Sequence, residues 1–184
     1  MPGLGQQDFA DLITRRLLCQ NAHDLDANHI ACGECSSCHW LQNQQHPDRL
    51  ALSAEAGKKI IGIDLVRQFL ADLVLTGVGA TRVGCIQGAE RLNRNASDSL
   101  LKTLEEPPLG RYLLLISEQP LRLSATLRSR CQRLTLTVPD TQLSQDYYAQ
   151  QHTEVIEPIL LRLAGGAPLL AEQWHNAGMM KYLL

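Results

Sequence analysis

The amino-acid sequence predicts an α/β fold, in which a parallel sheet has flanking helices and an inserted cysteine-rich module, and a small all-α domain follows. Strand-like apolar runs alternate with helical patterns up to about residue 138, and strand patterns stop beyond it. Four cysteines interrupt this alternation within residues 19–38. Strands separated by helices favour a parallel sheet with crossover helices. We therefore expect two domains, residues 1–138 and 139–184, with the cysteine module inside the first.

The first domain is expected to open with a helix. Gly3 and Gly5 precede apolar residues that recur at helical spacing up to Leu18, which predicts a glycine turn followed by an amphipathic helix. After the cysteines, residues 49–52 are a short strand candidate. Asp64 is then expected to cap an amphipathic helix that ends before the next glycines.

Two buried strands are predicted next, on either side of a helix. Residues 82–86 and 112–116 are apolar runs of strand length. Between them, Asn95 is expected to cap a helix over residues 96–104, and Pro107 is expected to stop it. If this is an ordinary capped helix with a proline stop, Glu105 and Glu106 lie on a solvated face; the alternative is that the region forms part of the face at the carboxyl end of the sheet.

The last elements of the first domain are a short helix over residues 123–130 and a half-buried strand over residues 134–138, where apolar residues alternate with threonines. The second domain shows helical patterns alone. Its helices are expected at residues 142–152, 154–163 and 169–177.

Composition bounds the classes of function. The chain has 184 residues, 45% of them apolar, and no apolar run approaches the length of about 18 residues that spans a bilayer. We expect a soluble, cytoplasmic protein without membrane contact. A formal net charge of −2 argues against a chain that binds nucleic acid by itself, because neutralising phosphates needs a surplus of Lys and Arg. With only 4% aromatic residues, a stacking platform for single strands is also disfavoured.

The strongest chemical signal is the set Cys19, Cys32, Cys35 and Cys38, the last three in the run Cys-Gly-Glu-Cys-Ser-Ser-Cys. Two adjacent two-residue gaps let a tight turn aim three thiolates at one point, while the first cysteine arrives from the preceding helix. This spacing predicts a closed, structural Zn²⁺ site. A disulfide pair with two spare thiols and an iron–sulfur cluster are the alternatives.

Other metal-ligating side chains lie nearby or elsewhere in the chain. His23, His29, His39 and His46 are competing ligand candidates, although a histidine in a polar stretch is more often a surface residue. Cys85 and Cys131 stand in apolar surroundings, where a thiol behaves as a small hydrophobe.

Three motifs together resemble a known family. The run NASDSLLKTLEEPP at residues 95–108, followed by Ser129-Arg130-Cys131, looks like the clamp-loader branch of the AAA+ ATPases. With a four-cysteine knuckle after the first helix and His-Pro-Asp at residues 46–48, the chain resembles the bacterial DNA polymerase III clamp-loader subunits, either the tau/gamma ATPases or the delta-prime branch. The resemblance implies an AAA+-like sheet followed by a helical lid domain.

The glycine loop distinguishes the two branches. If Gly5 is the second glycine of a Walker A loop, Gln6 stands where the lysine belongs and Gln7 where Ser or Thr belongs, so Gly3 and Gly5 form a degenerate P-loop. After the strand at residues 82–86, Gln-Gly-Ala precedes the first acid, where an ATPase places residues for magnesium. Both losses favour the delta-prime branch, with ATP binding not expected. An ordinary strand-to-helix turn is the alternative for the glycines.

The resemblance also assigns a role to Arg130. In this family the arginine of Ser-Arg-Cys projects toward the nucleotide of a neighbouring subunit and stabilises charge on the transferred phosphoryl group. The alternative is that Arg128 and Arg130 are exposed cations that complement a helix dipole.

The function expected from the resemblance is that of a non-hydrolysing subunit of the sliding-clamp loader in DNA replication. Its partners would be the tau/gamma and delta subunits, with the sliding clamp and primer-template DNA reached through the assembly. An active tau/gamma-type ATPase, or an unrelated zinc module that binds nucleic acid, are the other hypotheses. We expect the chain to be a fragment that lacks the family's collar domain and the strand before the glycine loop. That missing strand would leave a slot between residues 82–86 and 112–116.

Overall fold

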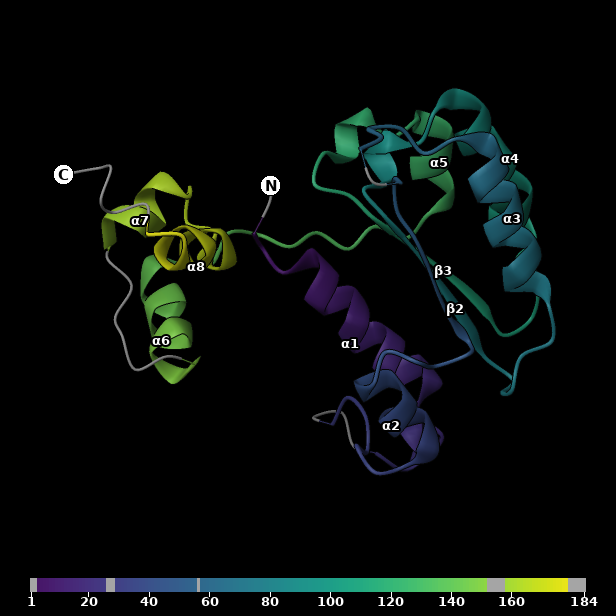
Figure 1. The fold of residues 1–184 in the computed structure, drawn as a ribbon, viewed down its shortest axis with the longest axis horizontal. Coiled ribbons are helices and arrows are strands. Elements are labelled where there is room, and N and C mark those ends of the chain that lie inside the picture. The colour runs from purple at the N-terminus through teal and green to yellow at the C-terminus, as the bar shows by residue number, and fades with distance from the viewer. Residues whose placement is uncertain (1–2, 26–28, 56, 152–157, 179–184) are drawn as a thin grey trace. The chain divides into compact units, whose positions relative to one another are not determined.

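The computed structural model describes residues 3–25, 29–55, 57–151 and 158–178 (Figure 1). The chain divides into two compact units, Gln7–Arg133 and Met1–Gln6 with Leu134–Leu184. We call the first the sheet unit and the second the helical unit. None of the helices in the described ranges is long and apolar enough to cross a membrane.

The sheet unit is built on three parallel strands, β1 (Arg49–Leu52), β2 (Arg82–Gln87) and β3 (Arg111–Ile116), in the order β1-β2-β3. The central strand β2 is the most buried, because helices cover it on both faces. The parallel sheet and the three strands predicted at these positions are confirmed. The expected slot between the second and third strands is wrong, because β2 pairs directly with β3 along its whole length.

Helices cover both faces of this sheet (Figure 1). One face carries α3 (Ile63–Val74), α4 (Arg94–Glu105) and α5 (Ala125–Arg130). Their shared core includes the fully buried residues Ile61, Val66, Ile86, Leu100 and Leu127. The other face carries α1 (Gln6–Leu18) and α2 (Ser36–Gln42), through Leu18 and Leu41 packed on Val83 and Cys85. Successive β2 side chains thus alternate between the two cores, as a strand's period of two requires.

Single-turn helices and caps complete the connections. The turns are η1 (Ala22–Asp24), η2 (Ala89–Arg91) and η3 (Pro120–Arg122). The cap of α4 is Asn93, whose Oδ1 accepts from the backbone N–H of Ala96 at 2.8 Å. The predicted cap, Asn95, lies inside the helix. Gly62, in extended conformation, precedes α3, so Asp64 lies in the first turn and complements the helix dipole instead of capping it.

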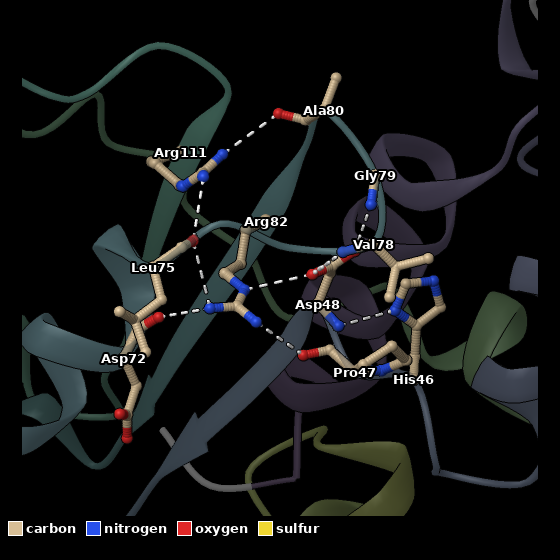
Figure 2. A network of polar contacts seen from close by, with 10 residues as sticks. All are labelled: His46, Pro47, Asp48, Asp72, Leu75, Val78, Gly79, Ala80, Arg82 and Arg111. Carbon is tan, nitrogen blue, oxygen red and sulfur yellow. Dashed lines mark hydrogen bonds and ion pairs between the residues drawn. The ribbon is translucent and has the colours of Figure 1, made fainter.

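A buried polar network ties the segment before β1 to the loop before β2 (Figure 2). The Asp48 carboxylate, on a residue that is 1% exposed, accepts from the backbone N–H groups of Val78 and Gly79 and from Nε of Arg82 at 3.2 Å. The same guanidinium donates to backbone carbonyl oxygens, including that of Pro47. Removing one partner of such a buried pair leaves an uncompensated charge, at a cost of about 3–5 kcal/mol. The network therefore fixes the loop that leads into the central strand.

The predicted strand over residues 134–138 is wrong. This segment contains no strand, and Leu134 and Val138 are exposed. Its alternating pattern suits a strand, but a strand also needs a neighbouring backbone to pair with. Among the described residues, the sheet ends at β3 on one side and at β1 on the other, and neither pairs with this segment.

The helical unit contains α6 (Thr141–Gln151), α7 (Pro158–Leu163) and α8 (Pro168–Asn176). Its own core contains Tyr148, Leu160, Leu161, Ala164 and Ala171. The three helices predicted for this region are present, although residues 152 and 154–157 of the predicted ranges lie outside the described residues.

Candidate metal centre and arginine site

Two helices and the loop between them position the four-cysteine cluster. Cys19 follows the last turn of α1, where its N–H donates to the carbonyl oxygen of Arg15. Cys32 and Cys35 lie in the connecting loop, and Cys38 lies in the first turn of α2. Cys35 is the N-cap of α2, with its sulfur accepting from the N–H of Cys38. The sequence thus folds the three clustered cysteines around one helix start.

The sulfur positions suit one tetrahedral metal. Sγ of Cys32 lies 3.6 Å from that of Cys19 and 3.9 Å from that of Cys38, and the four sulfurs all lie within 4.8 Å of one another. A Zn–S bond of about 2.3 Å in tetrahedral geometry places its sulfurs about 3.8 Å apart. A disulfide has an S–S bond length of about 2.05 Å, so these four cysteines form no disulfide with one another. The four cysteines could hold a metal ion.

The pKa values of two of the cluster's thiols shift in opposite directions. Backbone N–H groups of Glu34 and Cys35 donate to the Cys32 sulfur and lower its pKa to about 6. Burial raises the pKa of Cys38 to about 12. The Cys32 thiol is therefore largely ionised at neutral pH, whereas the buried Cys38 thiol needs a nearby cation to lose its proton.

None of the described histidines belongs to the four-residue group. His46 is buried, its Nδ1 accepts from the N–H of Asp48 at 3.0 Å, and its ring meets Trp40 edge-on. His23 faces the carboxylate of Asp24 on the surface.

The two remaining cysteines are small buried or half-buried groups elsewhere in the fold. Cys85 lies on β2 against the hydroxyl of Thr14, with sulfur and oxygen 3.7 Å apart. Burial raises the pKa of both Cys85 and Cys131, which keeps these thiols protonated and unreactive at neutral pH.

The glycine loop has backbone geometry that glycine favours. Gly3 and Gly5 have φ values of 77° and 78°. A Cβ on Gly3 would come within 2.5 Å of Leu170, and its carbonyl oxygen accepts from the N–H of Leu169, so packing within the helical unit accounts for this glycine. At the following helix, the Gln7 amide donates to the carboxylate of Asp11 one turn later.

The segment after β2 carries its first acid in η2. Gly88 adopts the left-handed conformation, and Glu90 follows within the short turn Ala89–Arg91. Oε2 of Glu90 is buried without a hydrogen-bond partner among the described residues. The strand's end therefore presents Gln87 and a glycine turn before any carboxylate, as the sequence indicates.

Arg130 is the last residue of α5, at the surface of the sheet unit. Its Nε and Nη2 each lie 2.7 Å from the same carboxylate oxygen of Glu105, the last residue of α4. Nη1 donates to the carbonyl oxygen of Thr126 at 3.2 Å. Arg128, two residues earlier, is exposed. Glu105 is 51% exposed, as a solvated face requires, but its contact with Arg130 was not predicted from the sequence.

One sequence signal could have found it. Glu105 is an acid at the carboxyl end of a helix, where the helix dipole disfavours negative charge. A nearby cation would offset this unfavourable interaction, and in the folded chain Arg130 forms an ion pair with Glu105.

The parallel sheet with helices on both faces, together with the inserted cysteine module, defines an α/β protein with a candidate metal centre. The family described as DNA polymerase III, delta subunit, matches residues 1–140. The chain therefore belongs to this family of DNA polymerase III subunits, and curated relatives at 38–39% identity are named DNA polymerase III subunit delta'.

Individual relatives agree with this assignment. DNA polymerase III subunit delta' of Pseudomonas aeruginosa is 38% identical over 182 residues, covering 96% of this chain and 54% of the relative. The corresponding protein of Yersinia pestis is 39% identical over 181 residues, covering 94% and 52%. A DNA polymerase III subunit tau/gamma, of Haemophilus influenzae, is 31% identical over 170 residues, covering 90% and 24%. The chain spans about half the length of the delta' relatives.

Proposed function

We propose that this chain belongs to a non-hydrolysing clamp-loader subunit that lends Arg130 to the ATP site of a neighbouring tau/gamma subunit during DNA replication. The observation that carries the proposal is the position of Arg130. Its side chain is 34% exposed at the end of a helix on the surface, within the Ser-Arg-Cys motif. A guanidinium there is open to a partner and has the planar, multi-donor geometry that suits phosphate oxygens.

The chain's own nucleotide loop supports the same division of labour. Gln6 and Gln7 open α1 where a Walker A loop has lysine and a hydroxyl residue, so no side-chain cation or magnesium ligand comes from these positions. The amide of Gln7 is engaged with Asp11. The loop is thus a structural remnant in the proposal, and catalysis belongs to the neighbour.

The cysteine cluster has a structural role in this proposal, with Zn²⁺ as its metal. Four thiolates leave no open coordination position for water or substrate, so the metal holds the knuckle in place and does no chemistry. The helical unit acts as the lid domain. The tau/gamma and delta subunits are the direct partners, and the clamp and primer-template DNA are reached through the complete loader.

Equilibrium binding of magnesium–ATP to the purified chain tests the proposal against an active ATPase. We expect no binding at micromolar nucleotide, because the loop offers neither lysine nor hydroxyl. Micromolar binding that is lost when Gly5 is replaced by a bulky residue would favour the ATPase hypothesis. Tight, strongly salt-dependent binding of the chain to duplex DNA would favour a nucleic-acid-binding zinc module instead.

A further inference from the structure

The guanidinium of Arg130 is held along one edge by a single carboxylate. Nε and Nη2 both meet Oε1 of Glu105 at 2.7 Å, and Nη1 meets the carbonyl oxygen of Thr126 and the hydroxyl of Ser129. All three nitrogens therefore have a partner. The edge that carries Nε points at Glu105, which fixes the orientation of the guanidinium plane.

The scaffold that carries the two side chains is rigid. Glu105 ends α4 and Arg130 ends α5, and these helices pack together through Leu100 and Leu127, which are fully buried in the same core. Pro107 prevents α4 from continuing. The distance between the two helix ends is therefore set by the core and not by the ion pair.

The contact is too weak to withhold the arginine from a stronger anion. Glu105 is 51% exposed and Arg130 34% exposed, and a partly exposed pair of this kind shifts an equilibrium by no more than about fivefold. A guanidinium has five N–H donors, and the contacts in the structure leave at least one of the two on Nη2 open. Arg130 can therefore donate from Nη2 to a phosphate oxygen while its Nε remains hydrogen-bonded to Glu105.

We infer that Glu105 is a positioning residue for the arginine finger: it orients the Arg130 guanidinium before a neighbouring nucleotide arrives. This inference rests on the proposed function of Arg130. A long, flexible side chain loses rotamer freedom when it binds, and an ion pair that has already ordered it reduces that loss at the interface. Glu105 touches no substrate and acts through Arg130 alone.

The test uses the complete clamp loader, assembled with the full-length subunit carrying Glu105→Ala, and measures DNA-stimulated ATP hydrolysis. We expect turnover to fall about two- to fivefold, with half-saturating ATP and assembly unchanged. Glu105→Gln should give a smaller loss, because its amide oxygen still accepts from Nε. Glu106→Ala is the matched control, since the adjacent acid has no contact with Arg130 in the described structure, and it should leave turnover unchanged.

A double-mutant comparison isolates the mechanism. In an Arg130→Ala background, Glu105→Ala should cause no further loss, because its effect passes through the arginine. An unchanged or raised turnover for Glu105→Ala alone, or an equal loss in both backgrounds, overturns the positioning role. If Arg130→Ala itself has no effect on turnover, the finger proposal fails, and this inference fails with it.

Discussion

Replacing Arg130 with alanine in the full-length subunit is expected to lower ATP hydrolysis at the neighbouring site of the assembled clamp loader by about a thousandfold. Arginine fingers supplied in trans contribute on the order of 10³–10⁵ to turnover, because they stabilise charge that develops on the transferred phosphoryl group. In the proposal Arg130 acts at a neighbouring site, because the glycine loop of its own chain lacks the lysine of a Walker A loop. The measurement is single-turnover hydrolysis by the reassembled loader in the presence of primed DNA.

Two variants separate the finger from simpler roles of positive charge. Arg128→Ala removes an exposed cation from the same helix and should leave turnover nearly unchanged. Arg130→Lys keeps the charge but loses the planar fork, so most of the loss should remain. Turnover unaffected by Arg130→Ala would remove the finger. Failure of the variant to join the loader would make Arg130 an interface residue instead.

Removal of the proposed Zn²⁺ is expected to unfold the cysteine knuckle, residues 19–38. Structural zinc in small modules contributes about 10–16 kcal/mol of apparent binding free energy at neutral pH. Because such modules do not stay folded without the metal, this binding free energy stabilises the folded state. Cys38→Ser, at a residue that is 4% exposed, should leave the purified chain with less than about a tenth of the wild-type zinc content. Amide exchange across residues 19–42 should accelerate strongly, both in this variant and on strong chelation.

Unfolding of the knuckle should also destabilise the sheet, through the side chains that pack between them. Leu18 and Leu41, on the two helices beside the knuckle, cover Val83 and Cys85 of β2. Exchange in β2 should therefore rise modestly, while the opposite core keeps the strand folded. Cys131→Ser is the matched control, because this thiol is outside the cluster, and it should retain full zinc. A chain that purifies without zinc and exchanges slowly over the knuckle, or one that carries iron, would contradict the prediction.

Much of the sheet unit follows from local patterns in the sequence. The strands at residues 49–52, 82–87 and 111–116 are short apolar runs bounded by turns, and the cysteine spacing alone indicated a converging cluster. These features depend on residues close together in the chain. The segment at residues 134–138 has an equally good local pattern and forms no strand, because pairing depends on a neighbouring backbone that local sequence does not specify.

The contacts that the sequence did not reveal join residues far apart in the chain. Asp48 and Arg82 are separated by 34 positions, and Glu105 and Arg130 by 25. Each is an ordinary charged residue in its local context, and only the tertiary fold brings the partners together. The cap at Asn93 was missed for a smaller reason, since two asparagines stand two residues apart and backbone conformation decides between them.

The location of nucleotide around Arg130 tests the central claim most directly. A structure of the complete loader, with the full-length subunit, a non-hydrolysable ATP analogue and primed DNA, should place a guanidinium nitrogen of Arg130 within about 3 Å of a phosphate oxygen. That nucleotide should be bound to the neighbouring subunit, and the Gly3–Gly5 loop should hold none. Nucleotide in this chain's own loop, with Arg130 turned away from the neighbour's phosphates, would contradict the account.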